Sequence, residues 1–277
     1  MPLVFGRSGY LKIGTVIYPT LNVQLSNPRT LMIPPLVGRD WQWNYAEGVR
    51  VTRLSAQIVI RDKANEALSA DFLNLFLQRT SGDTPSVTIE ADDGARRFTI
   101  NNAKGEILSI AVGKGDMLVW NATFVAPTAP TFAARTPFTA PDASAPLTFA
   151  AVSFTNAPEV YAFEFAIQNN HVLDAPLVNS SGANQGIGGN AYDAGLMQAG
   201  ASFTFKTQTG SPIADGASVT MTITGSGGKT RSFTLQYLVA QNPEDVAFAV
   251  GPVFKTIRYT VLGTATNPPV TIAGTGF

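Results

Sequence analysis

Apolar and polar side chains alternate along residues 51–61 with the period of two that an extended β-strand imposes. The apolar positions are mainly Leu54, Ala56, Ile58 and Ile60, and the polar ones are mainly Arg53, Ser55, Gln57 and Arg61. Residues 201–208 repeat the pattern, with Ala201, Phe203 and Phe205 between Ser202, Thr204, Lys206 and Gln208. We expect both stretches to be half-buried antiparallel strands, each with one packed face and one face against water or a polar partner.

A helical period occurs at residues 65–79, where Leu68, Phe72, Leu75 and Phe76 fall on one side of a helix. The sequence Ser81-Gly82-Asp83 follows and ends the pattern. We therefore expect one amphipathic helix over residues 65–79, covering the apolar face of the sheet.

Further strands are predicted on both sides of the middle of the chain. In the first half they cover residues 86–91, 97–100, 106–112 and 116–125, with Asp92-Asp93-Gly94 as the turn of a hairpin between the first two. In the second half they cover residues 147–154, 160–167, 217–224, 231–239 and 254–262. The polar, Gly-rich residues 179–200 between them predict a long loop.

The composition changes at residues 127–146, where prolines are interspersed with Ala and Thr and apolar periodicity is missing. Such a segment is extended and semi-rigid, so we interpret it as a linker. We expect one β domain over residues 1–126 and a second over residues 147–277.

The two halves resemble each other in sequence. Arg97-Phe-Thr-Ile100 corresponds to Ser232-Phe-Thr-Leu235, and Leu25-Ser-Asn27 corresponds to Ile167-Gln-Asn169. Strand 51–61 then corresponds to residues 201–208. Matches in the same order predict a duplicated fold, although the second half has no counterpart of the helix. The expected fold class is mainly β: two tandem, related β-sandwich or barrel domains, the first with one flanking helix.

Charge and cysteine content limit the function classes. The chain has 19 basic and 19 acidic residues, so no net field attracts nucleic acid or an anionic membrane. Cysteine is absent, which excludes disulfides, thiolate nucleophiles and Cys-based metal sites. The first residues resemble no signal peptide and no apolar run is long enough to span a membrane, so we expect folding in a cytoplasm, with no membrane partner.

No catalytic, cofactor or metal site is predicted. The single histidine, His171, has no carboxylate near it in sequence and is interpreted as a capping or surface residue. Asp92-Asp93 is typical of a turn rather than a cation site. Gly227-Gly228-Lys229-Thr230 resembles the end of a phosphate-binding loop, but a strand rather than a helix follows it, so it offers phosphate no helix N-terminus. We expect a protein that is not an enzyme.

A duplicated small β domain with one helix, a Thr-, Ser- and Asn-rich surface, no cysteine and a long Gly-rich loop together resemble the major tail tube protein of a long-tailed, non-contractile, siphovirus-type bacteriophage. The resemblance covers nearly the whole chain and rests on architecture and the repeat, not on a short motif. It implies a structural virion protein, assembled in the host cytoplasm, whose stacked rings form the tail tube. In two-domain versions three chains make a pseudo-hexameric ring.

The resemblance also implies partners and sites. The partners are further copies of the chain, the tape measure protein, the tail terminator and distal tail proteins, and DNA that passes through the lumen without sequence-specific binding. Five polar residues are expected to face the lumen: Arg53, Ser55, Gln57, Thr204 and Lys206. Contacts between subunits or rings are expected at Trp41, Trp43, Tyr45, Gly186, Gly188 and Gly189.

Other interpretations remain open at this stage. The five polar residues can simply face solvent on a monomer, and the three aromatic residues can plug the end of a β core instead of anchoring a partner. A carbohydrate-binding β-sandwich adhesin would use the same aromatic residues to stack on sugars. Another virion component, such as a distal tail or decoration protein, would share the architecture.

Overall fold

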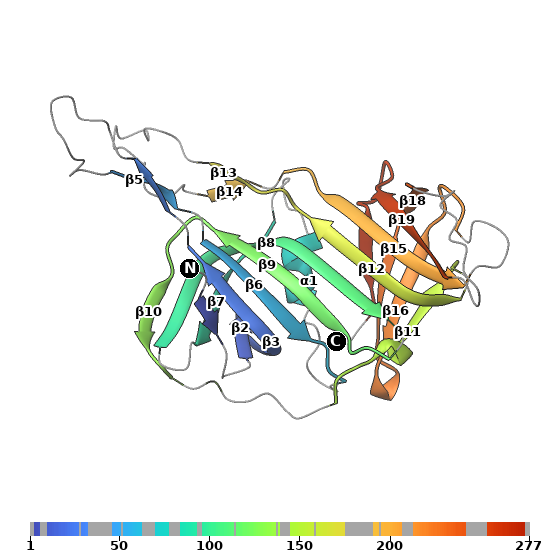
Figure 1. Cartoon of the computed structure of the whole chain (residues 1–277), viewed down its shortest axis with the longest axis horizontal. Helices are drawn as coiled ribbons and strands as arrows, with labels where there is room; N and C mark the ends of the chain where they lie inside the picture. Colours follow the sequence, from blue (N-terminus) through green and yellow to red (C-terminus); the bar gives the residue numbers. More distant parts are fainter. Residues whose placement is uncertain are drawn as a thin grey trace.

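The computed structural model of the chain describes residues 3–5, 10–27, 29–32, 46–50, 52–62, 70–77, 84–92, 96–113, 115–136, 138, 145–157, 159–174, 191–193, 195–206, 213–241 and 254–274. Strands dominate this part of the chain (Figure 1). The mainly β fold class is therefore confirmed. Ten of the strands follow one another in a single path through the largest sheet, and a smaller four-stranded sheet faces part of it.

The first half forms a closed barrel. Its strands are β2 (Tyr10–Ile13), β3 (Val16–Ser26), β6 (Thr52–Val59), β7 (Ser86–Asp92), β8 (Arg96–Gly113) and β9 (Val119–Ala126). They pair in the order β8-β7-β2-β3-β6-β9, and the pairing of β9 with β8 closes the ring. In β6 the buried and exposed positions alternate as the sequence predicts, because only one face of the strand points into the barrel.

The helix α1 (Ala70–Leu77) contributes large side chains to the barrel core. Phe72 and Phe76 are buried, and the ring of Phe76 lies 5.2 Å from the ring of Phe124 on β9. The prediction of a helix that covers the apolar face is confirmed for these residues. The rest of the predicted helix, including Leu68, lies outside the described residues.

Strand β8 corrects the prediction of separate strands at residues 97–100 and 106–112, since both belong to one strand of 18 residues. Its first part pairs with β7, and its second part pairs with β9 on one edge. Gly105 lies between the two parts. A Cβ atom there would come within 2.7 Å of the carbonyl oxygen of Leu75, so glycine allows α1 to approach the strand.

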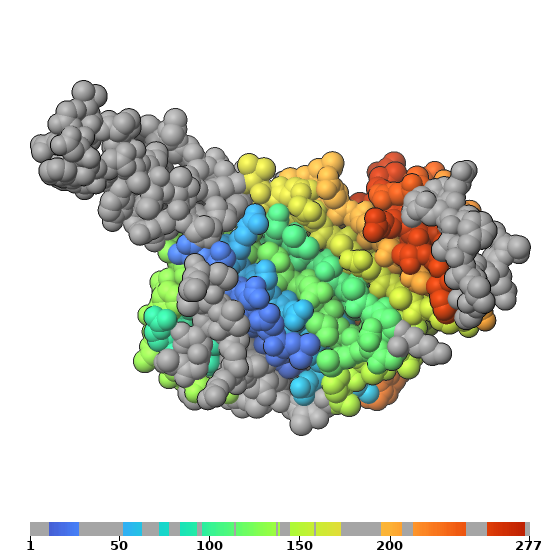
Figure 2. Space-filling view, viewed as in Figure 1, coloured from blue at the N-terminus to red at the C-terminus, as the bar shows by residue number. Residues whose placement is uncertain are grey.

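The second half continues the same sheet. The strands β12 (Val160–Gln168), β15 (Gln198–Lys206), β19 (Phe254–Leu262) and β18 (Tyr237–Ala240) follow β8 in this order. The junction is the antiparallel pairing of β12 with β8, where Leu108 lies opposite Ile167. The sheet therefore runs through the predicted domain boundary without a break, and Figure 2 shows green and yellow surfaces in broad contact.

A second sheet covers the apolar face of these strands. It contains β11 (Val152–Thr155), β16 (Val219–Thr224), β17 (Thr230–Leu235) and β20 (Val270–Ala273). Phe154 on β11 makes edge-on ring contacts with Phe163 and Phe203, 5.1 and 5.7 Å away. The core is shared with the barrel, because the ring of Trp120 on β9 lies 5.4 Å from the ring of Phe233 on β17.

The pairing pattern supports the predicted repeat. Val23, Ala56 and Ala122 lie opposite one another on β3, β6 and β9. Phe165, Ala201 and Tyr259 lie opposite one another at the equivalent positions of β12, β15 and β19. The β7–β8 hairpin corresponds to β16–β17, and the second part of β8 corresponds to β18.

The two copies differ in whether their strands close into a barrel. In the first copy β2 pairs with both β3 and β7, which closes the barrel. In the second copy β11 pairs with β16, and no pairing of β11 with β12 is present among the described residues. The second copy is therefore a sandwich whose two sheets stay separate.

The predicted linker, residues 127–146, contains the strand β10 (Thr131–Ala134), which pairs with the first part of β8. All four of its residues are exposed, which explains why no apolar period marks it. β20 holds the equivalent place beside β17 and was not predicted either.

Short elements complete the chain. Strand β1 (Leu3–Phe5) pairs with β3, β4 (Arg29–Met32) pairs with β5 (Ala46–Arg50), and β13 (Val172–Asp174) pairs with β14 (Ala191–Asp193). Two 3-10 turns cover Phe149–Ala151 and Ser226–Gly228. The predicted loop at residues 179–200 therefore contains β14 and the start of β15.

Candidate functional site: the polar sheet face

The outward face of the large sheet is the candidate site. On the barrel side it consists of alternate residues of β3, β6 and β9, whose other residues fill the core. Gln24, Ser55 and Thr123 form one row, and Asn22, Gln57 and Asn121 form the next. We call this outward surface, with its continuation below, the polar face.

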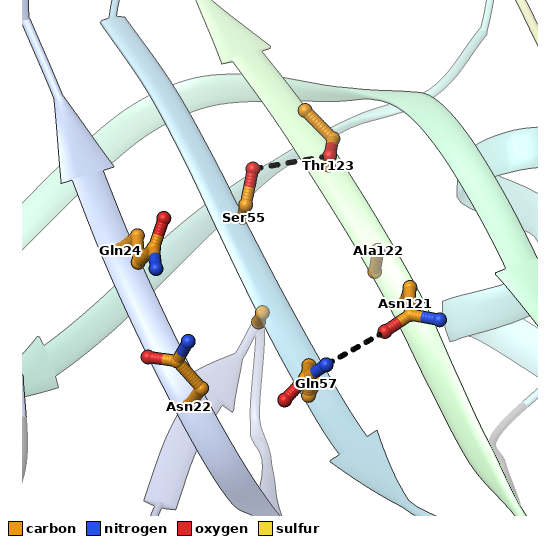
Figure 3. Close-up of a pocket in the computed structure, with 8 residues that line it drawn as sticks. Asn22, Gln24, Ser55, Gln57, Asn121, Ala122 and Thr123 are labelled. Atoms are coloured by element: carbon orange, nitrogen blue, oxygen red, sulfur yellow. Dashed lines mark hydrogen bonds between the residues drawn. The ribbon is translucent and has the colours of Figure 1, made fainter.

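Hydrogen bonds between neighbouring strands order these rows. The hydroxyl groups of Ser55 and Thr123 lie 3.1 Å apart, and Nε2 of Gln57 donates to Oδ1 of Asn121 at 3.2 Å (Figure 3). The side chains stand around a shallow hollow with a volume of about 220 Å³. The polar side chains around the hollow are all amides or hydroxyls, so the face is polar but carries no charge in this region.

The polar face continues across the junction onto the second copy. Ser109 of β8 lies opposite Ala166 of β12, and Ala166 lies opposite Gly200 of β15. On β15 and β19 the hydroxyl groups of Thr204 and Thr256 lie 2.8 Å apart. Small neutral side chains therefore cover both copies along the same rows of the sheet.

Few charged residues interrupt this surface. Among the described residues that alternate onto the polar face, the charged ones are Arg53, Lys104, Glu164, Lys206 and Arg258, of which Lys104 is buried. Glu164 lies opposite Ser202, and Ser202 lies opposite Arg258, so an acid and a base are separated by one strand. Arg53 and Lys104 share one row with Val125 between them, and the other charges are scattered over β12, β15 and β19.

The five residues predicted to face a lumen lie on two strands of the large sheet. Arg53, Ser55 and Gln57 are exposed on β6, Lys206 is exposed on β15, and Thr204 on β15 is half-buried. All five lie on the polar face, although the two strands belong to different copies. Trp41, Trp43, Tyr45, Gly186, Gly188 and Gly189 lie outside the described residues.

A buried polar cluster at the junction was missed by the sequence reasoning. Nδ1 of His171 donates to Oε2 of Glu106 at 2.5 Å, and Nε2 of His171 lies 2.7 Å from the hydroxyl of Thr84. The histidine is therefore not a surface residue, because its side chain is fully buried. Glu106 is 65 residues away in sequence, so no local spacing could have indicated the pair.

The surroundings of this cluster lower the pKa of Glu106. Burial acts to raise the pKa of the Glu106 carboxyl, but hydrogen bonds from the side chain and backbone of His171 lower that pKa below its ordinary value. Asn169 adds bonds from its side-chain amide to the carbonyls of Phe76 and Gly105. The cluster thus ties β12, β8 and α1 together.

The order hydroxyl, imidazole, carboxylate is that of an acyl-transfer triad. Here Thr84 and its two partners are buried, so the hydroxyl group is not exposed to solvent in this structure. The arrangement therefore acts as a structural cluster. In the part of the chain that the structure describes, no group of three or more His, Asp or Glu residues could hold a metal ion.

No protein-family model matches the chain, and no curated protein sequence matches it. No helix among the described residues is long and apolar enough to cross a membrane.

Proposed function

We propose that this chain is a structural virion protein, the major tail tube protein of a siphovirus-type phage, which polymerises into stacked rings that conduct DNA during ejection. The observation that carries the proposal is the polar face, because one continuous sheet carries it over both copies of the repeated fold. A surface shared by two copies in equivalent positions is suited to lining a common channel.

The chemistry of the polar face fits the passage of DNA. Basic clusters hold the phosphate backbone, with affinities that grow with each neutralised phosphate. A wall of hydroxyl, amide and small apolar groups with only scattered charges makes few such contacts. Asn22, Gln57, Asn121 and Ser109 form one such row across the strands, so a polyanion that crosses this row meets no basic cluster that would retain it.

The repeat supports the ring geometry. If three chains form one ring, six copies of the fold surround the axis with pseudo-sixfold symmetry. Each junction would be heterologous, and a rotation that closes gives a ring rather than an open filament. Rings stacked on one another would give the tube, with the tape measure protein inside and the tail terminator and distal tail proteins at its ends.

Strand edges support assembly as well. The edges of an open sheet promote uncontrolled pairing unless they are covered or used. The junction of β8 with β12 shows how one copy uses the edge of the other within the chain. The same device between chains would leave no open edge in the ring.

Negative-stain electron microscopy of the purified protein tests the proposal. Six compact copies around an axis give rings or short tubes on the order of 10 nm across, from the usual size of domains of this length. We expect these particles to appear as the protein concentration rises. A chain that stays monomeric at every concentration and binds glycans would instead favour the adhesin.

A further inference from the structure

The junction inside the chain predicts the geometry of the junction between chains. Within the chain, the second part of β8 pairs with β12, antiparallel, and joins the first copy to the second. Since the fold is repeated, the same contact in a ring would join β18 of one chain to β3 of the next. This step rests on the proposed function, because it assumes that the ring closes with equivalent contacts.

The register of that contact follows from the repeat. Leu108 of β8 lies opposite Ile167 of β12. Leu108 lies opposite Ala122 of β9, and Ala240 lies opposite Tyr259 of β19. Ala122 and Tyr259 are equivalent in the repeat, so Ala240 is the equivalent of Leu108. Leu25 is the equivalent of Ile167, because both lie two residues after the matched Val23 and Phe165. A ring therefore places Ala240 opposite Leu25 of the next chain, and Gln241 opposite Gln24.

That position on β3 is already occupied in the single chain. Strand β1 pairs with β3 antiparallel, with Leu3 opposite Leu25 and Val4 opposite Gln24. The direction and the register are those that β18 of a neighbour would adopt. We propose that β1 is a displaceable cap, which covers the edge of β3 in the free chain and leaves when the next copy of this chain binds there.

The opposite edge carries a cap of its own. The backbone N–H of Ala240 donates to Oδ1 of Asp215 at 2.8 Å, and Asp215 is exposed. The preceding residue on that edge, Leu238, is bonded to the backbone of Ala217. A single side chain thus covers the first donor that a neighbour would use, and it can rotate away without unfolding the strand.

The absence of cysteine allows a direct test of the cap. Directly opposite residues of antiparallel strands have Cα atoms about 4.5–5.5 Å apart, a spacing that a disulfide spans. The double variant Val4→Cys with Gln24→Cys would lock β1 onto β3 when oxidised and release it when reduced. We expect the oxidised protein to lose ring formation and the reduced protein to regain it.

The single variants Val4→Cys and Gln24→Cys are the controls for side-chain effects. Rings formed equally well by the oxidised and reduced double variant would overturn the cap. If wild-type protein and reduced variant both fail to form rings, the proposed function fails, and the cap falls with it.

A second pair tests the register between chains. Gln24→Cys with Gln241→Cys should form disulfides between chains on oxidation, giving covalent trimers in denaturing gels. The matched control is Ser109→Cys with Ala166→Cys, the equivalent pair inside one chain, which should give only crosslinked monomers. If rings form but the thiols at positions 24 and 241 do not crosslink, while the control pair does, the inferred register is contradicted even if the tube proposal holds.

Discussion

Nδ1 of His171 lies 2.5 Å from Oε2 of Glu106, so the end of β12 is bonded to the middle of β8 at the point where the two copies meet. The pKa of Glu106 is lowered in the fold, so the carboxylate stabilises the fold above its unfolded pKa of about 4.3, and that stability is lost as the pH falls through the lower folded pKa.

We therefore predict that Glu106→Gln weakens the pH dependence of unfolding below about pH 5, because the variant has no carboxylate to protonate there. Urea unfolding midpoints between neutral and acidic pH measure this. Glu164→Gln, a change on the exposed face, is the matched control. An unchanged pH profile for Glu106→Gln would contradict the assignment of acid sensitivity to this cluster.

Gly105→Ala should destabilise the fold by about 1–3 kcal/mol, since the added methyl group meets the ring of Phe76 and a carbonyl oxygen of α1. Chemical denaturation gives the difference in unfolding free energy. Gly200→Ala is the control on β15, where the nearest atom to a new Cβ is the Tyr259 carbonyl oxygen at an ordinary 3.7 Å. Equal effects of the two substitutions would argue against the close approach of α1 to β8.

Phe233→Ala should cost about 3–5 kcal/mol, because it removes a fully buried ring that packs on Trp120 of the other copy. Since the core and the sheet are shared, we also expect calorimetry to show one unfolding transition for the wild type. Leu262→Ala, at a position 46% exposed, is the control with a small effect. Two separate transitions, of which Phe233→Ala lowers only one, would show that the copies unfold independently.

Removal or reversal of charge on the polar face should leave the fold almost unchanged. Arg53 and Lys206 are both exposed, but the charge of Arg53 also lowers the pKa of Glu106, so Arg53 is tested with a neutral residue. Arg53→Gln and Lys206→Glu should each shift the unfolding free energy by no more than about 0.5 kcal/mol. Thermal and urea unfolding of the two variants measure this. If either variant unfolds, its side chain is required inside the folded chain, and the assignment of the face to a lumen is wrong.

The elements that could be predicted are those with one buried and one exposed face. β6, β15 and β19 show the period of two because their alternate side chains enter the core. The middle of β8 could not be predicted, because residues 103–106 are all buried between α1, β9 and the start of the second copy, so they show no alternation. β10 could not be predicted for the opposite reason, since all its residues are exposed.

The site divides in the same way. Ser55 and Thr204 could be assigned to polar strand faces from local pattern alone. The two faces belong to one sheet because β8 pairs with β12. Most of the residues paired at this junction are more than 50 positions apart in sequence. The pairing of Glu106 with His171 depends on the same junction, and no composition or spacing rule reaches across that distance.

Thiol accessibility in assembled tubes tests the central claim most directly. Ser55→Cys places a single thiol on the polar face, and Thr224→Cys places one on the exposed outer surface of β16. In tubes we predict that a small maleimide modifies both thiols, whereas a maleimide on a polymer wider than the lumen modifies only the thiol at position 224. In separated chains the polymer should modify both. Modification of the thiol at position 55 by the polymer at the same rate in tubes as in separated chains would show that the polar face does not line the channel.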